Sequence, residues 1–380
     1  MAAIERALVV GGGIGGLTAG VALRQAGIAV DLVEINPAFS VYGVGIIQPN
    51  NTLRALDRIG LARRCVDLGA PFPGWRIHDA AGNFIMDAPN ETRAAPDFPP
   101  NNGITRPDLQ RVLSEAAYAH GVSVRLGVKV ETIEDRGDRV DVSLSDGTAD
   151  SYDLVIGCDG LYSDMRRRIF GDAVTPQFTG QAVWRYNFPR PKELVWGEIH
   201  AGPNSKVGLT PMRHDLMYMF LVSAEPGNPW MPQDRLADLM RERLTGFSGF
   251  IAQLGEQIVD PAGVVYKPME NLLLPAPWNK GRVLIIGDAA HATTPHLAQG
   301  AAMAIEDAVL LGELLGRREA DFDALMAEFM ARRFDRARFV VESSDQIAQW
   351  EMESWKGIHN PEARPGEVLH HATVALLEDF

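Results

Sequence analysis

The sequence predicts an α/β fold in which a domain built on a parallel sheet is interrupted by a β-rich segment. Residues 5–34 read as strand, glycine turn, helix and strand. Residues 283–311 show the same change from strand to helix near the other end of the chain, and residues 178–223 are rich in short strands. Strands joined by a crossover helix lie parallel, so the two outer parts are expected to share one sheet.

The first of these stretches contains a complete βαβ unit. "RALVV" is a short apolar run, and "GGGIGG" is a turn. "LTAGVALRQAG" carries apolar residues at helical spacing and ends at Gly27, and "IAVDLVE" is the second strand. The change of hydrophobic period from two to about 3.6 and back predicts strand, helix and strand in that order.

The rest of the chain divides into three predicted segments. Residues 1–175 form the first part of the nucleotide-binding domain with small inserted strands, among them a hairpin in "GWRIHDAAGNFIMD". Residues 176–274 form a β-rich domain, and residues 275–380 return to the first domain and end in helices. "FDALMAEFMARRFDRARFVVESSDQIAQW" is expected to be one long helix.

Composition excludes several classes of protein. Of 380 residues, 46% are hydrophobic and 22% are charged, as in ordinary globular proteins. A net charge of -13 argues against nonspecific binding to nucleic acid, and no apolar run approaches the roughly 20 residues of a membrane span. Cys65 and Cys158 match no metal-binding spacing. A cytoplasmic protein without nucleic-acid or membrane partners is expected, and its long C-terminal helices suggest a homodimer.

The glycine turn predicts a dinucleotide site. Gly11, Gly13 and Gly16 form GxGxxG, in which one glycine makes the turn, one lets a pyrophosphate approach and one lets helix and strand pack. Glu34 ends the second strand, where a carboxylate can accept hydrogen bonds from ribose hydroxyls. This favours FAD or NAD over NADP at this site, whereas the alternative is an ordinary turn with a surface glutamate.

Three further segments decide between these cofactors. "DLVIGCDGLYSDMRRRIFG" contains Asp159, "VLIIGDAAHATTPHLAQGAAMAIEDAVLL" contains Asp288, and "ITRPDLQRVL" contains Arg106. In this order, together with the glycine turn, they resemble the signatures of single-component FAD-dependent aromatic hydroxylases, the para-hydroxybenzoate hydroxylase-like monooxygenases. The resemblance runs from residue 5 to about residue 345. It implies a Rossmann-like FAD-binding domain with an inserted β-rich substrate domain.

The residues expected to bind FAD come from all of these segments. Small residues after Asp288 permit close backbone approach, and the helix that follows can stabilise negative charge on reduced flavin through its N-terminus. The predicted cofactor residues are Gly11, Gly13, Ile14, Gly15, Gly16, Glu34, Gly45, Arg106, Val130, Asp159, Asp288, Pro295, Gln299, Gly300 and Ala301.

The resemblance also implies the reaction. NAD(P)H reduces FAD, O₂ adds to the reduced flavin, and the resulting C4a-hydroperoxide hydroxylates a small aromatic or N-heteroaromatic ring. Substrate residues are expected in the β-rich segment. The candidates are Trp184, Arg185, Lys206, Thr210, Met212, Tyr218 and Phe220.

Two subgroups of the family resemble this chain locally. "SKVGLTPMRHDLMYMF" is similar to a segment of FAD-dependent urate hydroxylases, in which an arginine and a tyrosine contact the substrate. Tyr218 falls at the tyrosine position, and Lys206 stands where those enzymes have arginine, losing its planar fork. "VYGVGIIQPN" is similar to 6-hydroxynicotinate monooxygenases, although Ile47 replaces their histidine.

Four residues are predicted to act on the substrate. Tyr218 can hydrogen-bond or deprotonate a phenol, Arg185 can pair with a carboxylate, and Lys206 and His296 can face the substrate. His291 and His296 lack a clear third ligand, so no metal site is predicted. Two alternatives stay open: a flavin-dependent halogenase or other FAD oxidoreductase on the same fold, and an FAD-binding sensor without activity.

Overall fold

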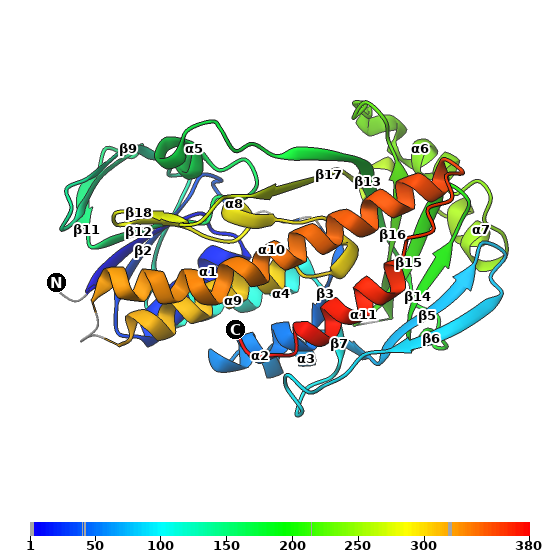
Figure 1. Cartoon of the computed structure of the whole chain (residues 1–380), viewed down its shortest axis with the longest axis horizontal. Helices are drawn as coiled ribbons and strands as arrows, with labels where there is room; N and C mark the ends of the chain where they lie inside the picture. Colours follow the sequence, from blue (N-terminus) through cyan, green and yellow to red (C-terminus); the bar gives the residue numbers. More distant parts are fainter. Residues whose placement is uncertain (1–3, 40, 42, 214, 318–320) are drawn as a thin grey trace.

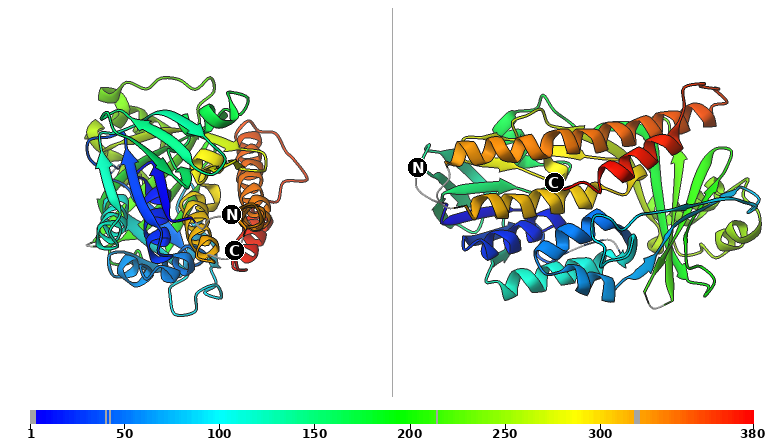
Figure 2. Two further views of the ribbon diagram at one scale, coloured as in Figure 1. Left: turned by 90° about the vertical axis from the view of Figure 1, so that its left-hand side faces the viewer. Right: turned by 60° about the horizontal axis from the view of Figure 1, so that its bottom comes forward.

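The computed structural model describes residues 4–39, 41, 43–213, 215–317 and 321–380 (Figure 1). Two large sheets lie toward opposite ends of the elongated molecule, and the long helix α10 (Phe322–Trp355) runs along both. The second and third views agree on this arrangement (Figure 2). The α/β fold and the long C-terminal helix are therefore confirmed.

The nucleotide-binding sheet has six strands in the order β18-β19-β12-β1-β2-β8. Its strands are β1 (Arg6–Val10), β2 (Ala29–Glu34), β8 (Ser123–Leu126), β12 (Leu154–Gly157), β18 (Asn279–Lys280) and β19 (Val283–Ile285). All neighbouring strands are parallel except β18 and β19. Strand β19 pairs with β12, so the chain does return to the first sheet after the β-rich segment, as the sequence predicts.

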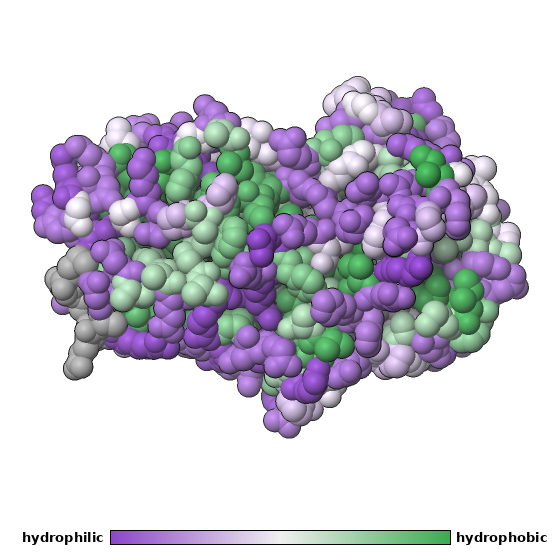
Figure 3. Space-filling view, in the orientation of Figure 1, coloured by the Kyte–Doolittle hydropathy of each residue, from purple (hydrophilic) through white to green (hydrophobic). Residues whose placement is uncertain are grey.

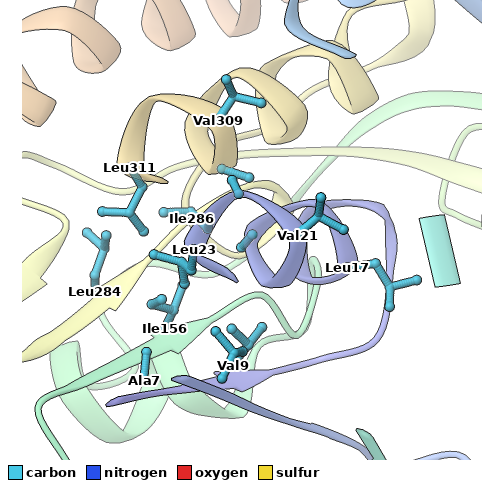
Figure 4. Close-up of a cluster of buried hydrophobic side chains, with 14 of the residues drawn as sticks. Ala7, Val9, Leu17, Val21, Leu23, Ile156, Leu284, Ile286, Val309 and Leu311 are labelled. Atoms are coloured by element: carbon cyan, nitrogen blue, oxygen red, sulfur yellow. The ribbon is translucent and has the colours of Figure 1, made fainter. Parts of the chain in front are cut away.

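Helices α1 (Ile14–Gln25) and α9 (Gly300–Leu315) pack together against this sheet. Figure 4 shows the core that they form with the strands, where Val21 of α1 and Val309 of α9 lie above Val9 of β1. The two helices can approach closely because Gly312 has no side chain. A Cβ placed there would lie only 2.7 Å from the Cβ of Ala22. This contact joins the first and last cofactor segments of the chain.

The second sheet has seven strands in the order β17-β13-β16-β15-β14-β5-β6. Its strands are β5 (Gly74–Asp79), β6 (Phe84–Pro89), β13 (Gln177–Pro189), β14 (Gly197–Ala201), β15 (Ser205–Met212), β16 (Leu216–Ala224) and β17 (Val265–Leu273). The predicted hairpin is β5 and β6, and it completes this sheet from within residues 1–175. The domain boundaries at residues 175 and 274 stay predictions.

The two faces of this sheet have different neighbours. One face packs Trp184, Leu209 and Leu221 with α6 (Leu236–Arg243) and α7 (Gly249–Glu256). The other face carries Phe220 and Tyr218, and it packs against Ile47 from the nucleotide-binding half. Because neighbouring residues of a strand point to opposite faces, only alternate residues of β13, β15 and β16 can face the cofactor half.

Smaller elements connect the two sheets. The described ones are β3 (Gly45–Pro49), β4 (Ala70–Phe72), β7 (Asn101–Thr105), β9 (Val130–Asp135), β10 (Val140–Leu144), β11 (Ala149–Tyr152), α2 (Asn50–Arg58), α3 (Ala62–Asp67), α4 (Arg106–Ala119), α5 (Asp164–Phe170), α8 (Asp288–His291), α11 (Pro365–Ala375), η1 (Gln233–Arg235), η2 (Pro261–Gly263) and η3 (Pro295–Leu297). The segment 51–69 reads as one helix in the sequence but forms two, because Gly60 adopts φ +76° between them.

The surface in Figure 3 shows hydrophobic patches broken up by hydrophilic residues. Among the described helices, none is both long and apolar enough to cross a membrane.

Candidate active site

The glycine turn brings the backbone of β1, α1 and β12 together. Gly11 has φ +111°, and a Cβ there would lie 2.4 Å from the carbonyl oxygen of Cys158. A Cβ at Gly16 would lie 1.9 Å from the carbonyl oxygen of Gly11. At Gly13, by contrast, none of the described atoms lies within 4 Å of the added Cβ. Gly11 and Gly16 are thus required by packing, whereas Gly13 leaves space open at the start of α1.

Glu34 lies beside this turn. Its carboxylate accepts a hydrogen bond from the backbone N–H of Gly12 at 2.8 Å and from that of Asn36 at 2.9 Å. Gln110 of α4 donates to the carbonyl of Gly12 at 2.8 Å from the other side. The turn is therefore held in place by side chains while its Gly13 side stays open.

The segment that contains Asp159 (the second motif, after the glycine turn) is braced against the segment that contains Asp288 (the third motif). Asp159 accepts hydrogen bonds from the Ser163 hydroxyl at 2.5 Å and from the N–H of Met165 at 3.0 Å, and burial raises its pKa. Arg166 is buried and donates to the carbonyl of Ala289 at 2.8 Å. Arg167 and Arg168 are instead exposed and pair with Asp164. The sequence run of three arginines did not reveal that Arg166 alone is buried and has this separate role.

The third motif rests on a buried network of charges. His291 Nε2 lies 2.6 Å from Asp307 Oδ2, and Asp307 also accepts from the N–H of Gly287 at 3.0 Å and from Arg333 at 2.7 Å. Burial alone would raise the pKa of Asp307, but His291 and Arg333 outweigh it and lower the pKa to about 2. His291 therefore supports the turn before Asp288 from within the protein.

The network continues to the start of α9. Gln299 and Asn51 exchange hydrogen bonds at 3.0 and 3.2 Å, and Asn51 also donates to Glu306. Glu306 pairs with Arg333 at 2.7 Å. The side chain of Gln299 thus fixes the N-terminal end of α9 against α2, and any contact with a cofactor would involve the backbone around Gly300.

Arg106 links the cofactor half to the second sheet. Its charge influences the pKa of Asp288 in the third motif and those of Arg185 and Tyr218 on the sheet. Asp288 is accessible to solvent, yet desolvation by the surrounding protein raises the pKa of its carboxyl. The backbone N–H of Arg106 donates to the carbonyl of Val44 at 3.0 Å, which holds the start of α4 beside β3.

Arg185 and Tyr218 lie near each other on the face of the second sheet that packs against β3. Burial raises the pKa of Tyr218, and burial with the nearby Arg106 lowers the pKa of Arg185 to about 10, so both are protonated at neutral pH. The electrostatic neighbours of Arg185 among the described residues include no carboxylate. A Cβ at Gly45 would lie 2.1 Å from the Tyr218 ring, so β3 passes directly over it. The arrangement suits an aromatic ligand with an anionic group.

These segments fit FAD. Open space at Gly13 lies before the N-terminus of α1, where a pyrophosphate is stabilised by free N–H groups. Asp288 offers an accessible carboxylate to a hydroxyl of the ribityl chain, and α9 begins with Gly300, Ala301 and Ala302, which admit close approach.

Comparison with known proteins agrees with this geometry. The family model described as "FAD binding domain" matches residues 5–344. The chain belongs to this FAD-binding family. It is 33% identical to the aurachin C monooxygenase/isomerase of Stigmatella aurantiaca over 349 residues, covering 90% of each protein. It is 30% identical to the 6-hydroxynicotinate 3-monooxygenase of Pseudomonas fluorescens over 368 residues, covering 90% of the chain and 91% of that enzyme.

A solved structure extends the likeness to the whole fold. The crystal structure of Klebsiella pneumoniae HpxO with FAD and uric acid superimposes with a TM-score of 0.85 at 25% identity, covering 98% of this chain and 97% of that one. The resemblance to FAD-dependent aromatic hydroxylases is confirmed. The protein is a FAD-dependent monooxygenase of the aromatic and heteroaromatic hydroxylase type.

The predicted substrate residues of the monooxygenase separate into two faces. Trp184 is fully buried on the opposite face, where its indole donates to Ser223 at 2.9 Å, so its prediction as a substrate contact is wrong. The remaining candidates, Arg185, Lys206, Thr210, Met212, Tyr218 and Phe220, share the face toward the cofactor half and are called the substrate face below.

Two clusters divide the substrate face of the monooxygenase. Tyr218 pairs in register with Thr210, whereas Lys206 pairs with Val222, four residues farther along β15. At about 3.4 Å per residue, Lys206 and Thr210 are separated by roughly 14 Å. Lys206 forms an ion pair with Glu351 of α10, and His296 contacts the same carboxylate. Sequence reasoning missed Glu351, because nothing in α10 distinguishes it from other helix glutamates.

The other cofactor residues that the sequence suggests remain predictions. Ile14 and Gly15 open α1, Pro295 is exposed in η3, and Val130 is buried at the start of β9. The carbonyl of Val130 lies 3.5 Å from a donor of Arg168, so this position is held by α5.

Proposed function

We propose that the protein uses NAD(P)H and O₂ to hydroxylate a small aromatic or N-heteroaromatic substrate bound between the substrate face and β3. The observation that carries the proposal is the grouping of Arg185, Tyr218 and Arg106 beside the third cofactor motif. Bound FAD would supply the redox chemistry, by accepting a hydride from the nicotinamide and activating O₂.

The chain's own residues would orient and activate the ring. Arg185 keeps its charge at neutral pH and can bind a carboxylate or a phenolate of the substrate. A phenolate is more electron-rich than a phenol, so this charge favours the reactive form of the ring. Tyr218 stays protonated because burial raises its pKa, and it can donate a hydrogen bond to the ring oxygen.

Apolar neighbours would exclude water from the same place. Ile47, Phe72 and Met212 pack with Tyr218 in one buried cluster. A water-poor site strengthens the interactions of Arg185 with an anionic ring and protects a reactive oxygen species from side reactions.

A nicotinamide would react at the same cofactor rather than from a domain of its own. The described residues contain one sheet of the parallel nucleotide-binding kind. We propose that NAD(P)H visits the FAD site transiently. A cytoplasmic location and a homodimer stay expectations.

The proposal is tested with purified protein reconstituted with FAD. We expect a yellow protein whose NAD(P)H oxidation rises with a phenol, hydroxybenzoate or hydroxypyridine and is matched by a hydroxylated product. An FAD-loaded protein whose NAD(P)H oxidation responds to no aromatic compound would contradict the proposed reaction.

A further inference from the structure

The carboxylate of Glu351 joins three segments that are far apart in the sequence. It forms an ion pair with Lys206 of β15, lies 3.1 Å from Nε2 of His296 in η3, and accepts from Gln181 of β13 at 3.3 Å. His296 is also fixed by the hydroxyl of Thr294 at 2.8 Å from Nδ1. Figures 1 and 2 show that α10 reaches the second sheet. The contacts with Lys206 and Gln181 place Glu351 at the substrate face.

This cluster carries no net positive charge. Burial would raise the pKa of Glu351, but Lys206 and His296 outweigh it and lower the pKa to about 2, so its charge cancels that of Lys206. Burial and the nearby Lys206 lower the pKa of His296, which stays neutral. Asp345 of α10 also acts on His296 and can add only negative charge.

The cluster remains within reach of a ligand. The side chain of Lys206 is 21% accessible and that of Glu351 is 18% accessible. Phe220 lies between this cluster and Tyr218, because it pairs with Gly208, which stands between Lys206 and Thr210 on β15. Its ring covers Gly208, where a Cβ would lie 2.0 Å from the ring. The substrate face therefore carries a cation at Arg185, in register with Phe220, and a cluster without net positive charge at the Lys206 end.

We propose that Glu351 is a specificity-determining residue. By holding the ammonium of Lys206, it makes this end of the substrate face accept an uncharged hydrogen-bonding substituent and disfavour an anion. The inference rests on the proposed aromatic substrate. It predicts that removing the charge of Glu351 frees Lys206 to pair with an anionic group.

The test measures binding to the FAD-loaded protein from the change in flavin absorbance. The probes are 4-hydroxybenzoate and 4-hydroxybenzamide, and 6-hydroxynicotinate and 6-hydroxynicotinamide. Glu351→Gln is expected to shift the affinity ratio toward the carboxylate of each pair by about 10-fold, the size of one charge-assisted hydrogen bond. In the double variant Lys206→Met/Glu351→Gln, the ratio is expected to return to that of the wild type.

Glu353→Gln is the matched control, because it makes the same charge change two residues along α10, where Glu353 contacts Asn360. It should leave the ratio unchanged. FAD content and melting temperature show whether each variant is folded. A folded Glu351→Gln protein with an unchanged ratio, or a shift that survives the double variant, would overturn the inference alone. If none of the four probes binds the FAD-loaded wild type, the proposed aromatic substrate fails and the inference fails with it. A shifted ratio without turnover would support the inference and contradict only the proposed reaction.

Discussion

The cofactor half and the substrate face of this monooxygenase are built by different means. In the cofactor half, backbone at Gly11, Gly13 and Gly16 shapes the site, and this turn packs against the backbone of Cys158. On the substrate face, side chains such as Arg185 and Tyr218 come from separate strands. Backbone sites depend on a fixed framework, whereas a face made of side chains can change its ligand by single substitutions.

The largest effect is expected from the framework beneath the cofactor half. Arg333 is fully buried between Asp307 and Glu306 at 2.7 Å from each. Arg333→Met leaves two buried carboxylates short of a partner and is expected to lower the free energy of unfolding by about 3 kcal/mol. Denaturant unfolding measures this change. Arg338→Met removes an exposed arginine from the same helix and should change little. Equal changes in the free energy of unfolding for the two substitutions would show that the buried charge network of Arg333 does not stabilise the fold more than an exposed arginine does.

A smaller and more specific effect is expected at Gly13. A Cβ there enters open space, so Gly13→Ala should leave the unfolding free energy within about 1 kcal/mol of the wild type. If the space takes the pyrophosphate, FAD should bind at least ~10-fold more weakly, since a lost interaction of 1.4 kcal/mol gives that factor. Titration of the apoprotein with FAD measures it. Gly366→Ala, also in open space but in α11, is the control. Unchanged FAD affinity in Gly13→Ala would place the pyrophosphate elsewhere.

The same contrast explains what the sequence could predict. The cofactor half was predictable because its sequence signals are local: Gly11, Gly13 and Gly16 lie within one turn, and Glu34 ends the next strand. Asp288 follows directly from a strand of the same sheet. Each signal combines residue type with a short spacing, and parallel strands then bring the motifs to one edge.

The substrate face was less predictable because strand register and helix packing assemble it. The sequence placed Trp184 with Arg185, but neighbouring strand residues point to opposite faces and only Arg185 faces the cofactor half. Lys206 and Tyr218 were both expected to contact the substrate, and strand register places them four residues apart along β15. The partner of Lys206 is Glu351, 145 residues away on α10, which no local pattern could indicate.

Substitution of Arg185 should weaken substrate binding without changing FAD binding. Arg185→Gln removes the cation nearest Tyr218 and is expected to raise the apparent KM for a hydroxybenzoate about 10-fold, since a charge-assisted hydrogen bond contributes about 1.5–3 kcal/mol. Steady-state NAD(P)H oxidation measures the change, and FAD affinity should stay constant. Arg235→Gln, an exposed arginine in η1, is the control. Loss of FAD in Arg185→Gln would assign this residue to the cofactor half instead.

The smallest effect is expected at Tyr218. Tyr218→Phe keeps the ring that packs with Met212 below Gly45 and removes only the hydroxyl. If that hydroxyl donates one hydrogen bond to the substrate, turnover or affinity should fall about 5-fold, corresponding to roughly 1 kcal/mol. Turnover and binding of the same phenol by the two proteins separate these possibilities. Identical values for both proteins would reduce Tyr218 to a packing residue and leave Arg185 as the residue that recognises the ring, whereas a loss confined to turnover would indicate that the hydroxyl acts after the substrate is bound.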